Sequence, residues 1–300
     1  MDDIFKKISG PLQENRSALI RAINREFYRD KAGLLKAAVG HLRQLESTGG
    51  VDELVFFINI LLVVYPRNEE LIKIAERHLP AFYGDELESQ LRLNQGSAVR
   101  YLTEIMRVTP VKSIIDFGTG PGAWLKAARD CGIDRIVGVE KHYRPAIDFP
   151  AEIISVDVCD PIERKSDLAV CVEVAEHIHP DKSELLIENI VRCSDLVLFG
   201  AASEHQSGDG HINCRKQSFW AELFMRKGYR LIDFFRAKFW TDPDIVKNYV
   251  QNTFLYVQTS SQHAASFSGR PLLDVDHPEM INAHYLNDYR KNKIFFENFN

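Results

Sequence analysis

The sequence predicts an α/β protein, with a parallel sheet flanked by helices and an all-helical region before it. From Val111 onward, short apolar runs alternate with helical patterns, which is the arrangement of β-α-β units with right-handed crossovers. Residues before about 108 instead carry apolar side chains at helical spacing. We therefore expect a helical N-terminal region over 1–95, a sheet domain over 96–260 and a C-terminal tail over 261–300.

The N-terminal region is expected to form several helices. Apolar residues recur at helical spacing over 19–27 and again over 34–42, and Gly49-Gly50 breaks the pattern. A last helix is predicted over 97–108. The apolar run Leu54–Tyr65 is shorter than the roughly 20 residues that a membrane span needs, so we expect a buried helix there.

Five strands are predicted in the sheet domain before the pattern changes. The apolar segments that predict them lie at 113–115, 135–139, 152–156, 167–172 and 195–199. Helical patterns lie at 123–131, 181–192 and 217–227. After Gly228, residues 229–235 and 249–258 are predicted to be two strands without a strong helix between them. They are expected to finish the sheet as an antiparallel pair.

Composition and charge narrow the class of protein. The chain has 300 residues, of which 45% are hydrophobic, as is ordinary for a globular protein. Its 37 basic and 42 acidic residues give a net charge of -5, whereas a dedicated nucleic-acid binder usually carries a basic excess. Five cysteines without a CxxC pair argue against a disulfide framework. With the acidic opening Met1-Asp2-Asp3, which is unlike a signal peptide, this predicts a cytoplasmic protein.

A glycine-rich loop follows the first predicted strand. It reads Asp116-Phe117-Gly118-Thr119-Gly120-Pro121-Gly122. Glycines at this place let the backbone approach a ligand closely, and ligands of open α/β sheets bind at the carboxyl ends of the strands. The spacing is GxGxG, whereas dinucleotide-binding loops show GxGxxG. Asp116 would repel a pyrophosphate and suits a cationic ligand.

Two further acids end the next two strands. Glu140 follows the second strand, where a carboxylate can accept hydrogen bonds from both hydroxyls of a ribose. Asp157 follows the third strand and can accept from an adenine amino group. Together with Asp116, these acids match an adenosine ligand that bears an amino acid and a positively charged sulfur.

Residues 112–258 resemble the class I S-adenosylmethionine-dependent methyltransferases. The resemblance rests on the loop 116–122, Glu140, Asp157 and the segment Val172-Glu173-Val174-Ala175-Glu176-His177-Ile178. It implies a Rossmann-like sheet of seven strands with a final antiparallel hairpin, and S-adenosylmethionine as cofactor. It also implies that Asp116, Gly118 and Gly120 border the methionine part, Glu140 the ribose and Asp157 the adenine. Phe117, Thr119, Gly122 and Glu173 are expected to bind the cofactor as well.

A looser resemblance concerns segments after the fifth strand. Residues 208–213, 218–220, 239–243 and 251–252 are similar to a bacterial subgroup that modifies glycans or secondary metabolites. We therefore expect the methyl acceptor to be a hydroxyl of a small molecule or glycan, methylated by direct displacement. Because the chain lacks a basic excess, we do not expect nucleic acid as the partner. Residues 1–95 show no such resemblance, and we expect them to form a substrate lid or a homodimer contact.

An oxygen nucleophile gains from a general base, which contributes about 10²–10⁴-fold. The candidates for this catalytic role are His211, in a glycine-rich loop after the fifth strand, and His177 and Glu176, which follow the fourth. A neutral imidazole is suited to accept a proton near neutral pH. His179 precedes Pro180 at a helix start and is expected to be at the surface or to cap that helix.

Two alternatives remain open at the level of sequence. Glu173, Glu176, His177 and His211 can together bind a divalent metal. The arrangement is similar to the E-x-x-E-H motif of small-RNA 3′-terminal 2′-O-methyltransferases, which implies an RNA ribose methyltransferase. Because metal-free relatives share the motif and the chain lacks a basic excess, we expect no metal. The other alternative is a methyltransferase-like protein that binds cofactor or a partner without turnover.

Overall fold

The fold was obtained as a computed structural model, in which the chain forms two compact units. The structure describes residues 29–51, 68–78, 87–141, 147–204 and 211–269, together with positions 53, 54, 57, 58, 61, 65, 145, 206 and 273–275. One unit comprises Met1–Gly84 and Ser207–Ile212, and the other comprises Asp85–Gln206 and Asn213–Asn300. The first unit is therefore made of two segments of the chain, and the second of them is a short segment after the fifth strand.

The first unit is helical where it is described. Helix α3 (Lys31–Thr48) begins at Asp30, whose side chain accepts a hydrogen bond from the N–H of Gly33, and ends at the left-handed Gly49. Helix α5 spans Glu69–His78. The helix predicted over 34–42 is thus confirmed, and the pattern over 19–27 lies outside the described residues.

The core of the helical unit combines α3 with the apolar run after it. Its buried residues include Leu34, Ala38, Val39, Leu42, Leu54, Phe57, Ile58, Leu61, Leu71 and Ile74. Ile212, from the second segment of this unit, is 3% exposed in the same core. No helix in the described ranges is long and apolar enough to span a membrane.

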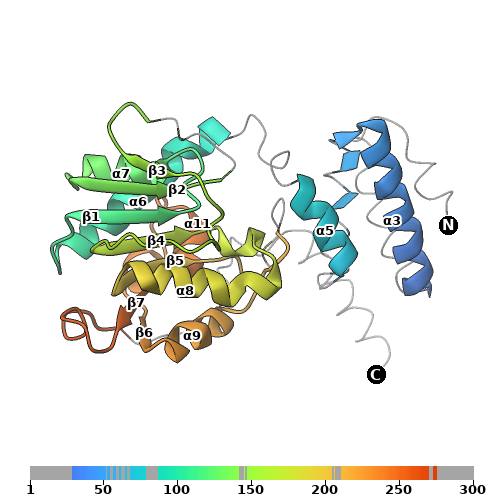
Figure 1. The fold of residues 1–300 in the computed structure, drawn as a ribbon. Helices are drawn as coiled ribbons and strands as arrows, with labels where there is room; N and C mark the ends of the chain where they lie inside the picture. Colours follow the sequence, from blue (N-terminus) through green and yellow to red (C-terminus); the bar gives the residue numbers. More distant parts are fainter. Residues whose placement is uncertain are drawn as a thin grey trace, which may run out of the picture. The chain divides into compact units, whose positions relative to one another are not determined.

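The second unit is built on a seven-stranded sheet in the order β3-β2-β1-β4-β5-β7-β6, shown in Figure 1. Its strands are β1 (Ser113–Phe117), β2 (Arg135–Val139), β3 (Glu152–Ile154), β4 (Leu168–Val172), β5 (Leu196–Gly200), β6 (Tyr229–Ile232) and β7 (Thr253–Gln258). Strands β1 to β5 pair in parallel, and β7 runs antiparallel to both β5 and β6. The predicted sheet with its final hairpin is confirmed. The strand order reverses between β1 and β4, which is where ligands of such sheets bind.

Helices cover both faces of this sheet (Figure 1). They are α6 (Leu87–Met106), α7 (Ala123–Asp130), α8 (Ser183–Cys193), α9 (Gln217–Arg226), α10 (Arg236–Phe239) and α11 (Lys247–Asn252), with short 3₁₀ turns at Ala175–His177 and Pro180–Lys182. Strands β1, β4 and β5 are buried along their whole length, as central strands covered on both faces are expected to be.

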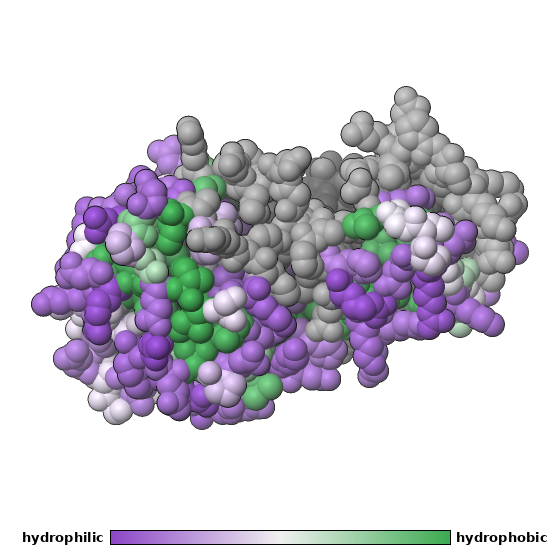
Figure 2. Space-filling model, turned by 45° about the horizontal axis from the view of Figure 1, so that its top comes forward, coloured by the Kyte–Doolittle hydropathy of each residue, from purple (hydrophilic) through white to green (hydrophobic). Residues whose placement is uncertain are grey.

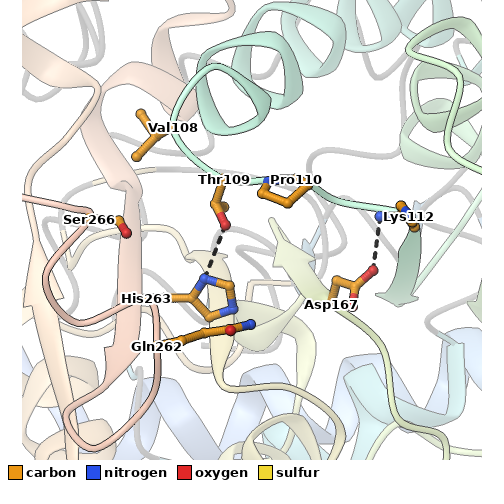
Figure 3. Close-up of a pocket in the computed structure, with 8 residues that line it drawn as sticks. All are labelled: Val108, Thr109, Pro110, Lys112, Asp167, Gln262, His263 and Ser266. Atoms are coloured by element: carbon orange, nitrogen blue, oxygen red, sulfur yellow. Dashed lines mark hydrogen bonds between the residues drawn. The ribbon is translucent and has the colours of Figure 1, made fainter.

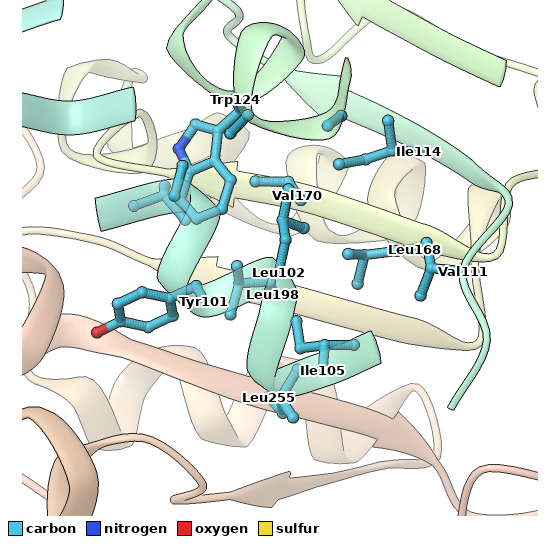
Figure 4. Packing of buried hydrophobic residues seen from close by; sticks show 14 of the residues in the cluster. Tyr101, Leu102, Ile105, Val111, Ile114, Trp124, Leu168, Val170, Leu198 and Leu255 are labelled. Carbon is cyan, nitrogen blue, oxygen red and sulfur yellow. The ribbon is translucent and has the colours of Figure 1, made fainter. Parts of the chain in front are cut away.

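Alternate strand residues point into two separate cores. Figure 4 shows Tyr101, Leu102 and Ile105 of α6 packed with Trp124 of α7 over side chains of β1, β4, β5 and β7. The opposite core is formed by α8 and α9, where Trp220 lies 5.3 Å from Phe199 of β5 between ring centroids. Because β1 contributes buried side chains to both cores, its register is fixed. The position of the glycine loop at its end is fixed with it.

Two predicted boundaries were wrong. The last N-terminal helix begins at Leu87, well before residue 97. Strand β3 ends at Ile154, because the N–H of Val156 turns back to bond the Ile154 carbonyl.

The largest difference lies in the final hairpin. Residues 249–252, predicted as strand, are the end of helix α11, and α10 also lies between β6 and β7. Tyr249 and Val250 favour strands by intrinsic propensity. Here Tyr249 is instead buried in a helix and stacks on Trp124, with ring centroids 5.8 Å apart, so tertiary packing overrides the local preference.

The surface of the sheet unit is mainly polar. Figure 2 shows hydrophilic residues over most of its visible face, with hydrophobic residues gathered in one band. The exposed large hydrophobic residues of the described chain are Val51, Leu93, Val108, Ile153, Leu185 and Met225. Single exposed hydrophobic residues are normal on globular proteins and do not by themselves mark a binding surface.

Candidate functional site

The glycine loop forms at the carboxyl end of β1, the central strand. Asp116 and Phe117 are the last two residues of the strand, so the loop begins at Gly118. Gly118 has φ of 71°, and a Cβ there would lie 2.6 Å from a methyl group of Val174. Only glycine therefore fits between the loop and the segment after β4.

Open space lies above the middle of the loop. Gly120 also has a positive φ, of 51°, but among the described residues no atom outside its own chain neighbours lies within 4 Å of where its Cβ would be. The loop is anchored from below, because the N–H groups of Gly118 and Thr119 both donate to the carbonyl of Val139, the last residue of β2. This leaves the outer surface of the loop accessible to a ligand while its backbone is held in place.

Asp116 is a buried carboxyl group with an unsatisfied oxygen. The residue is 1% exposed, and Oδ2 has no hydrogen-bond partner among the described residues. Burial raises the pKa of Asp116 well above its usual value, and the neighbouring Glu140 raises it further. A buried oxygen of this kind is costly unless a donor reaches it, so the site is suited to a cationic or N–H-bearing ligand.

Glu140 lies directly after β2 and reaches the glycine loop. Its Oε2 accepts a hydrogen bond of 2.7 Å from the N–H of Gly120, and the residue is 7% exposed. The structure therefore brings Asp116, Gly120 and Glu140 together. Through its contact with Gly120, Glu140 helps to hold the shape of the loop, and its contact with a ribose remains a prediction.

Asp157 lies three residues beyond the end of β3 and is more exposed. Its carboxylate accepts hydrogen bonds from Lys141 Nζ at 3.2 Å and from the N–H of Cys159 at 3.0 Å. Burial acts to raise the pKa of Asp157, but these two donors outweigh it and the pKa is lowered. The group is thus an ionised acceptor at neutral pH, beside the edge strand of the sheet.

Glu173 is held by a set of carboxamides that the sequence prediction missed. Its carboxylate accepts hydrogen bonds from Asn248 at 2.7 Å, Gln206 at 3.0 Å and Asn252 at 3.1 Å. Gln251, beside Asn252 in α11, extends the network by donating to Asn252 Oδ1 at 2.9 Å. The signal in the sequence was a cluster of amide side chains directly before a strand, but it was assigned to that strand.

The backbone at Glu173 is unusual as well. Its φ of 57° lies in the left-handed region, which non-glycine residues rarely adopt. Such a conformation costs of order 1–3 kcal/mol and persists where the surroundings enforce it. The carboxamide contacts supply that enforcement. The predicted contact of Glu173 with a cofactor remains a prediction.

Glu176 is the most enclosed acid of the site. It lies in the 3₁₀ turn Ala175–His177, is 0% exposed, and neither carboxyl oxygen has a hydrogen-bond partner among the described residues. Burial raises the pKa of Glu176 well above its usual value, and the charge of Glu173 raises it further. A ring nitrogen of His177 lies within 4.8 Å of its carboxyl group, and His177 is half-buried.

The other two histidines have different settings. His211 belongs to the helical unit, and it stands two residues before Asn213, whose N–H donates to the carbonyl of Glu176 at 2.8 Å. His179 Nδ1 accepts a hydrogen bond from the N–H of Asp181, so it caps the following turn as predicted. The catalytic roles of His211 and His177 remain predictions.

A pocket of about 360 Å³ lies at the opposite edge of the sheet (Figure 3). Lys112 and Asp167 line it and directly precede β1 and β4, so it faces the amino ends of the parallel strands. Its polar groups bond one another: Asp167 accepts from the N–H of Lys112, and Thr109 is bonded to His263 at 3.2 Å. These contacts stabilise the start of the sheet and do not form part of the site.

Comparison with known families gives a match over more than half of the chain. Residues 75–240 match a family described as a methyltransferase domain. The matched stretch contains the glycine loop, Glu140, Asp157 and the segment from Glu173 to His177. No curated protein matches the sequence.

Several solved methyltransferase structures are similar at low identity. The plantazolicin methyltransferase BpumL, in complex with a triazolic desmethylPZN analog and SAH, is 13% identical, with 64% of this chain and 99% of that chain covered and a TM-score of 0.43. Magnesium protoporphyrin IX methyltransferase from Synechocystis PCC 6803, with bound SAM, is 14% identical, covering 59% and 88% with a TM-score of 0.43. The methyltransferase domain of bacterial CtHen1-C is 18% identical, covering 55% and 97% with a TM-score of 0.42.

Proposed function

Because the chain belongs to the class I S-adenosylmethionine-dependent methyltransferases, we propose that it methylates a hydroxyl group of a small molecule or glycan. S-adenosylmethionine supplies an activated methyl group on a positively charged sulfur. The observation that carries the proposal is the buried Asp116 carboxyl, which has no partner at Oδ2 among the described residues and lies two residues before the first glycine of the loop.

The residues at the end of β1 fit the methionine part of this cofactor. Asp116 Oδ2 would accept a hydrogen bond from the ammonium group, which satisfies the buried oxygen and favours its ionised form. The open space above Gly120 would admit the ligand next to the backbone. Gly118, Thr119 and the remaining loop residues would border it.

The adenosine part would be held by the two later acids. Glu140 accepts a hydrogen bond from the N–H of Gly120 and would also accept from the ribose hydroxyls, since each carboxylate oxygen can accept more than one hydrogen bond. Asp157 would accept from the adenine amino group, next to its existing donors Lys141 and Cys159. The three acids at the ends of β1, β2 and β3 would thus bind the methionine, ribose and adenine parts of the ligand in that order.

A hydroxyl acceptor is supported by the imidazole and acid groups after β4. Methyl transfer to an oxygen releases a proton, and a positioned base increases the rate by about 10²–10⁴-fold. His177 is half-buried beside the Glu176 carboxyl, and His211 is the alternative base. The enzyme would otherwise act by aligning the acceptor with the methyl group and excluding water.

The metal-dependent RNA alternative has less support. Glu173 accepts three amide hydrogen bonds, which a metal ion would have to displace. The net charge of -5 also lacks the basic excess that RNA binding favours. Chelation decides the question: transfer that stops with EDTA and returns with Mg²⁺ or Mn²⁺ would favour the metal and RNA alternative over our proposal.

The proposal is tested with a panel of hydroxyl-bearing acceptors. We expect a methyl-group mass increase on a phenolic, glycosidic or other small-molecule hydroxyl when S-adenosylmethionine is present. Calorimetry should show binding of S-adenosylhomocysteine and none of NAD. Binding of S-adenosylhomocysteine without transfer to any hydroxyl, amine or thiol acceptor would favour a non-catalytic role, and transfer to nitrogen or RNA alone would overturn the hydroxyl proposal.

A further inference from the structure

The chain after β7 follows the outer edge of the sheet and reaches the edge that carries the glycine loop. Strand β7 ends at Gln258, beside the start of the edge strand β6. Further along, Arg230 of β6 donates a hydrogen bond to the carbonyl of Ala264 at 2.7 Å. The backbone at Gly269 then lies against the carbonyl of Asp233, one residue beyond the end of β6. Because β6 runs in the same direction as β5, this path leads toward the carboxyl ends of the parallel strands.

Residues 273–275, which we call the tail latch, are bonded to the start of helix α9. Asp274 Oδ1 accepts a hydrogen bond from the N–H of Ser218 at 2.9 Å, and its Oδ2 accepts from the Ser218 hydroxyl at 2.8 Å. The N–H of Asp274 donates to Gln217 Oε1 at 2.9 Å. Leu273 packs on the core beneath α8 and α9. The tail latch therefore has a defined place on the sheet unit.

Gln217 connects the tail latch to the carboxamides around Glu173. Its Nε2 donates to the carbonyl of Gln251 at 2.9 Å. The Gln251 side chain donates to Asn252 Oδ1 at 2.9 Å, and Asn252 donates to Glu173 at 3.1 Å. The three carboxamide residues are 3%, 0% and 2% exposed in this order. Each link is a direct hydrogen bond, so the tail latch is connected to Glu173 through buried groups.

Glu173 in turn determines how the segment after β4 packs against the glycine loop. Its left-handed backbone, with φ of 57°, is unfavourable by itself and persists only where the surroundings enforce it. The next residue, Val174, lies so close to the loop that a Cβ at Gly118 would be 2.6 Å from its methyl group. A change in the backbone of Glu173 would therefore move Val174 against the loop.

We propose that Asp274 and Gln217 are positioning residues for the cofactor, which act through Glu173. When the tail latch opens, the Gln251 carbonyl loses the support of its donor, Glu173 relaxes toward an ordinary φ, and the glycine loop loses its fixed shape. By linkage, bound cofactor must stabilise the tail latch by the same factor by which the latch strengthens cofactor binding. The inference rests on the placement of the cofactor at the glycine loop, and it holds whichever acceptor is methylated.

Calorimetry with S-adenosylhomocysteine tests the effect on affinity. Asp274→Ala removes the carboxylate that holds Ser218, and it should weaken binding about 5-fold, at the lower end of the range for coupling between separate sites. Asp274→Asn can keep both contacts, and asparagine tolerates the φ of 58° at this position, so it should retain the parental affinity. Ser218→Ala removes only the hydroxyl contact and should weaken binding by less, which keeps the test decisive if Asp274→Ala does not fold.

A double substitution separates the connection to Glu173 from simple capping of α9. Gln217→Met keeps a side chain of similar size but removes the bonds to Gln251 and Asp274, so it should weaken binding at least as much as Asp274→Ala does. Adding Asp274→Ala to Gln217→Met should lower the melting temperature further but leave the affinity unchanged, since residues of one network do not act additively.

Asp167→Ala is the matched control for lost capping. Its carboxylate also accepts from backbone N–H groups, those of Lys112 and Ser113, but at the opposite edge of the same sheet. It should lower the melting temperature and leave the affinity for S-adenosylhomocysteine at the parental value.

Hydrogen exchange in the full-length protein measures the reverse effect. Saturating S-adenosylhomocysteine should slow exchange of the Ser218 N–H, which is bonded to Asp274, by the same factor of about 5 in the parent. In Gln217→Met the ligand should leave this exchange rate unchanged.

The outcomes separate the inference from the placement of the cofactor. Parental affinity in Asp274→Ala, or an equal further loss in the double variant, would overturn the inference and leave Asp274 as a helix cap. If Asp116→Asn weakens binding in that case, the cofactor lies at the glycine loop and only the inference is wrong. If neither substitution weakens binding, the cofactor lies elsewhere and both are wrong. Transfer to a hydroxyl enters none of these measurements.

Discussion

At the scale of single residues, the candidate site combines carboxyl groups whose surroundings shift their pKa values in opposite directions. Burial raises the pKa of Asp116 and Glu176, whereas the donors around Asp157 lower its pKa. A raised pKa means that burial destabilises the ionised carboxylate in the ligand-free protein. Such groups are suited to bind a charged or proton-bearing ligand. Asp116 belongs to the proposed cofactor site, and Glu176 belongs to the proposed acceptor site.

Removing either cofactor-facing charge should weaken binding. Asp116→Asn and Glu140→Gln should each reduce S-adenosylhomocysteine affinity by about 10–100-fold, since a hydrogen bond to a charged group contributes about 1.5–3 kcal/mol. Isothermal calorimetry measures the effect, with Glu188→Gln as the control for loss of an exposed carboxylate. Affinity that survives both substitutions would place the cofactor elsewhere.

The buried acids should also make the stability of the cofactor-free protein depend on pH. The pKa of Asp116 in the folded chain is raised above its unfolded value near 3.8, so its contribution is fully present below that value. It is lost as pH rises through the folded pKa. The unfolding free energy from urea titrations should therefore fall with rising pH, and Asp116→Asn should flatten the curve.

Asp167 provides a control of opposite sign. Its pKa is lowered, because hydrogen bonds from Lys112 and Ser113 outweigh the effect of burial. Its contribution to stability is thus present above the unfolded pKa and lost as pH falls. Asp167→Asn should lower stability at neutral pH, by about 1 kcal/mol. Parallel curves for the parent and Asp116→Asn would contradict the assignment of the pH dependence to Asp116.

The sequence was sufficient to locate the residues at the strand ends but not those that surround Glu173. Asp116 and Glu140 follow apolar runs directly, so their position at the sheet edge can be read from the order of elements alone. Gln206, Asn248 and Asn252 reach Glu173 from places 33, 75 and 79 residues away in the chain. No local pattern encodes such contacts, because they arise only when β5, α11 and β4 come together.

At the scale of secondary structure elements, α11 and the glycine loop matter most. Helix α11 was missed because its Tyr249 and Val250 read as strand residues, although they are buried in a short helix. Helix α11 positions Asn248 and Asn252 to bond Glu173. Because the sequence predicted a strand there, the hydrogen bonds around Glu173 were not predicted either. The glycine loop was located correctly, since its glycines and the preceding acid form a continuous local signal.

Gly120→Ala should separate the ligand role of the loop from its folding role. Its positive φ makes alanine unfavourable by about 1–2 kcal/mol, while the open space above it admits the methyl group without a clash. Gly132→Ala is a matched control, with φ of 77° and the same absence of neighbours within 4 Å, at the far end of α7. Both should lower the melting temperature similarly.

Only Gly120→Ala should weaken the binding of S-adenosylhomocysteine. The added methyl group would occupy space next to the ligand, and the shifted N–H would loosen the contact with Glu140. We expect a decrease in affinity of roughly 10-fold or more, corresponding to about 1.4 kcal/mol. Equal affinities of the two variants, measured by calorimetry, would show that the outer surface of the loop does not contact the cofactor.

At the scale of the whole molecule, the sheet unit is a methyltransferase domain and the helical unit has no assigned chemistry. The chain leaves the sheet unit after Gln206, which bonds Glu173, and returns at Asn213, which bonds the carbonyl of Glu176. Between them, Ile212 is buried in the core of the helical unit. The two residues that flank this segment thus bond Glu173 and the backbone of Glu176, and we propose that the helical unit contributes to acceptor binding.

Loss of the helical unit should spare cofactor binding and abolish efficient transfer. A protein that begins at Asp85 should bind S-adenosylhomocysteine with the affinity of the parent, because Asp116, Glu140 and Asp157 all lie in the sheet unit. Its kcat/KM for the acceptor should fall at least about 100-fold, since misplacing a reactant by about 1 Å can cost that much. Ile212→Ala in the full chain offers a milder change, because it leaves a cavity in the core of the helical unit without removing the unit. It should raise the acceptor KM while cofactor affinity stays constant. Undiminished transfer in both proteins would assign the helical unit to another task, such as association of two chains, which sedimentation of the parent and the truncated protein would then reveal.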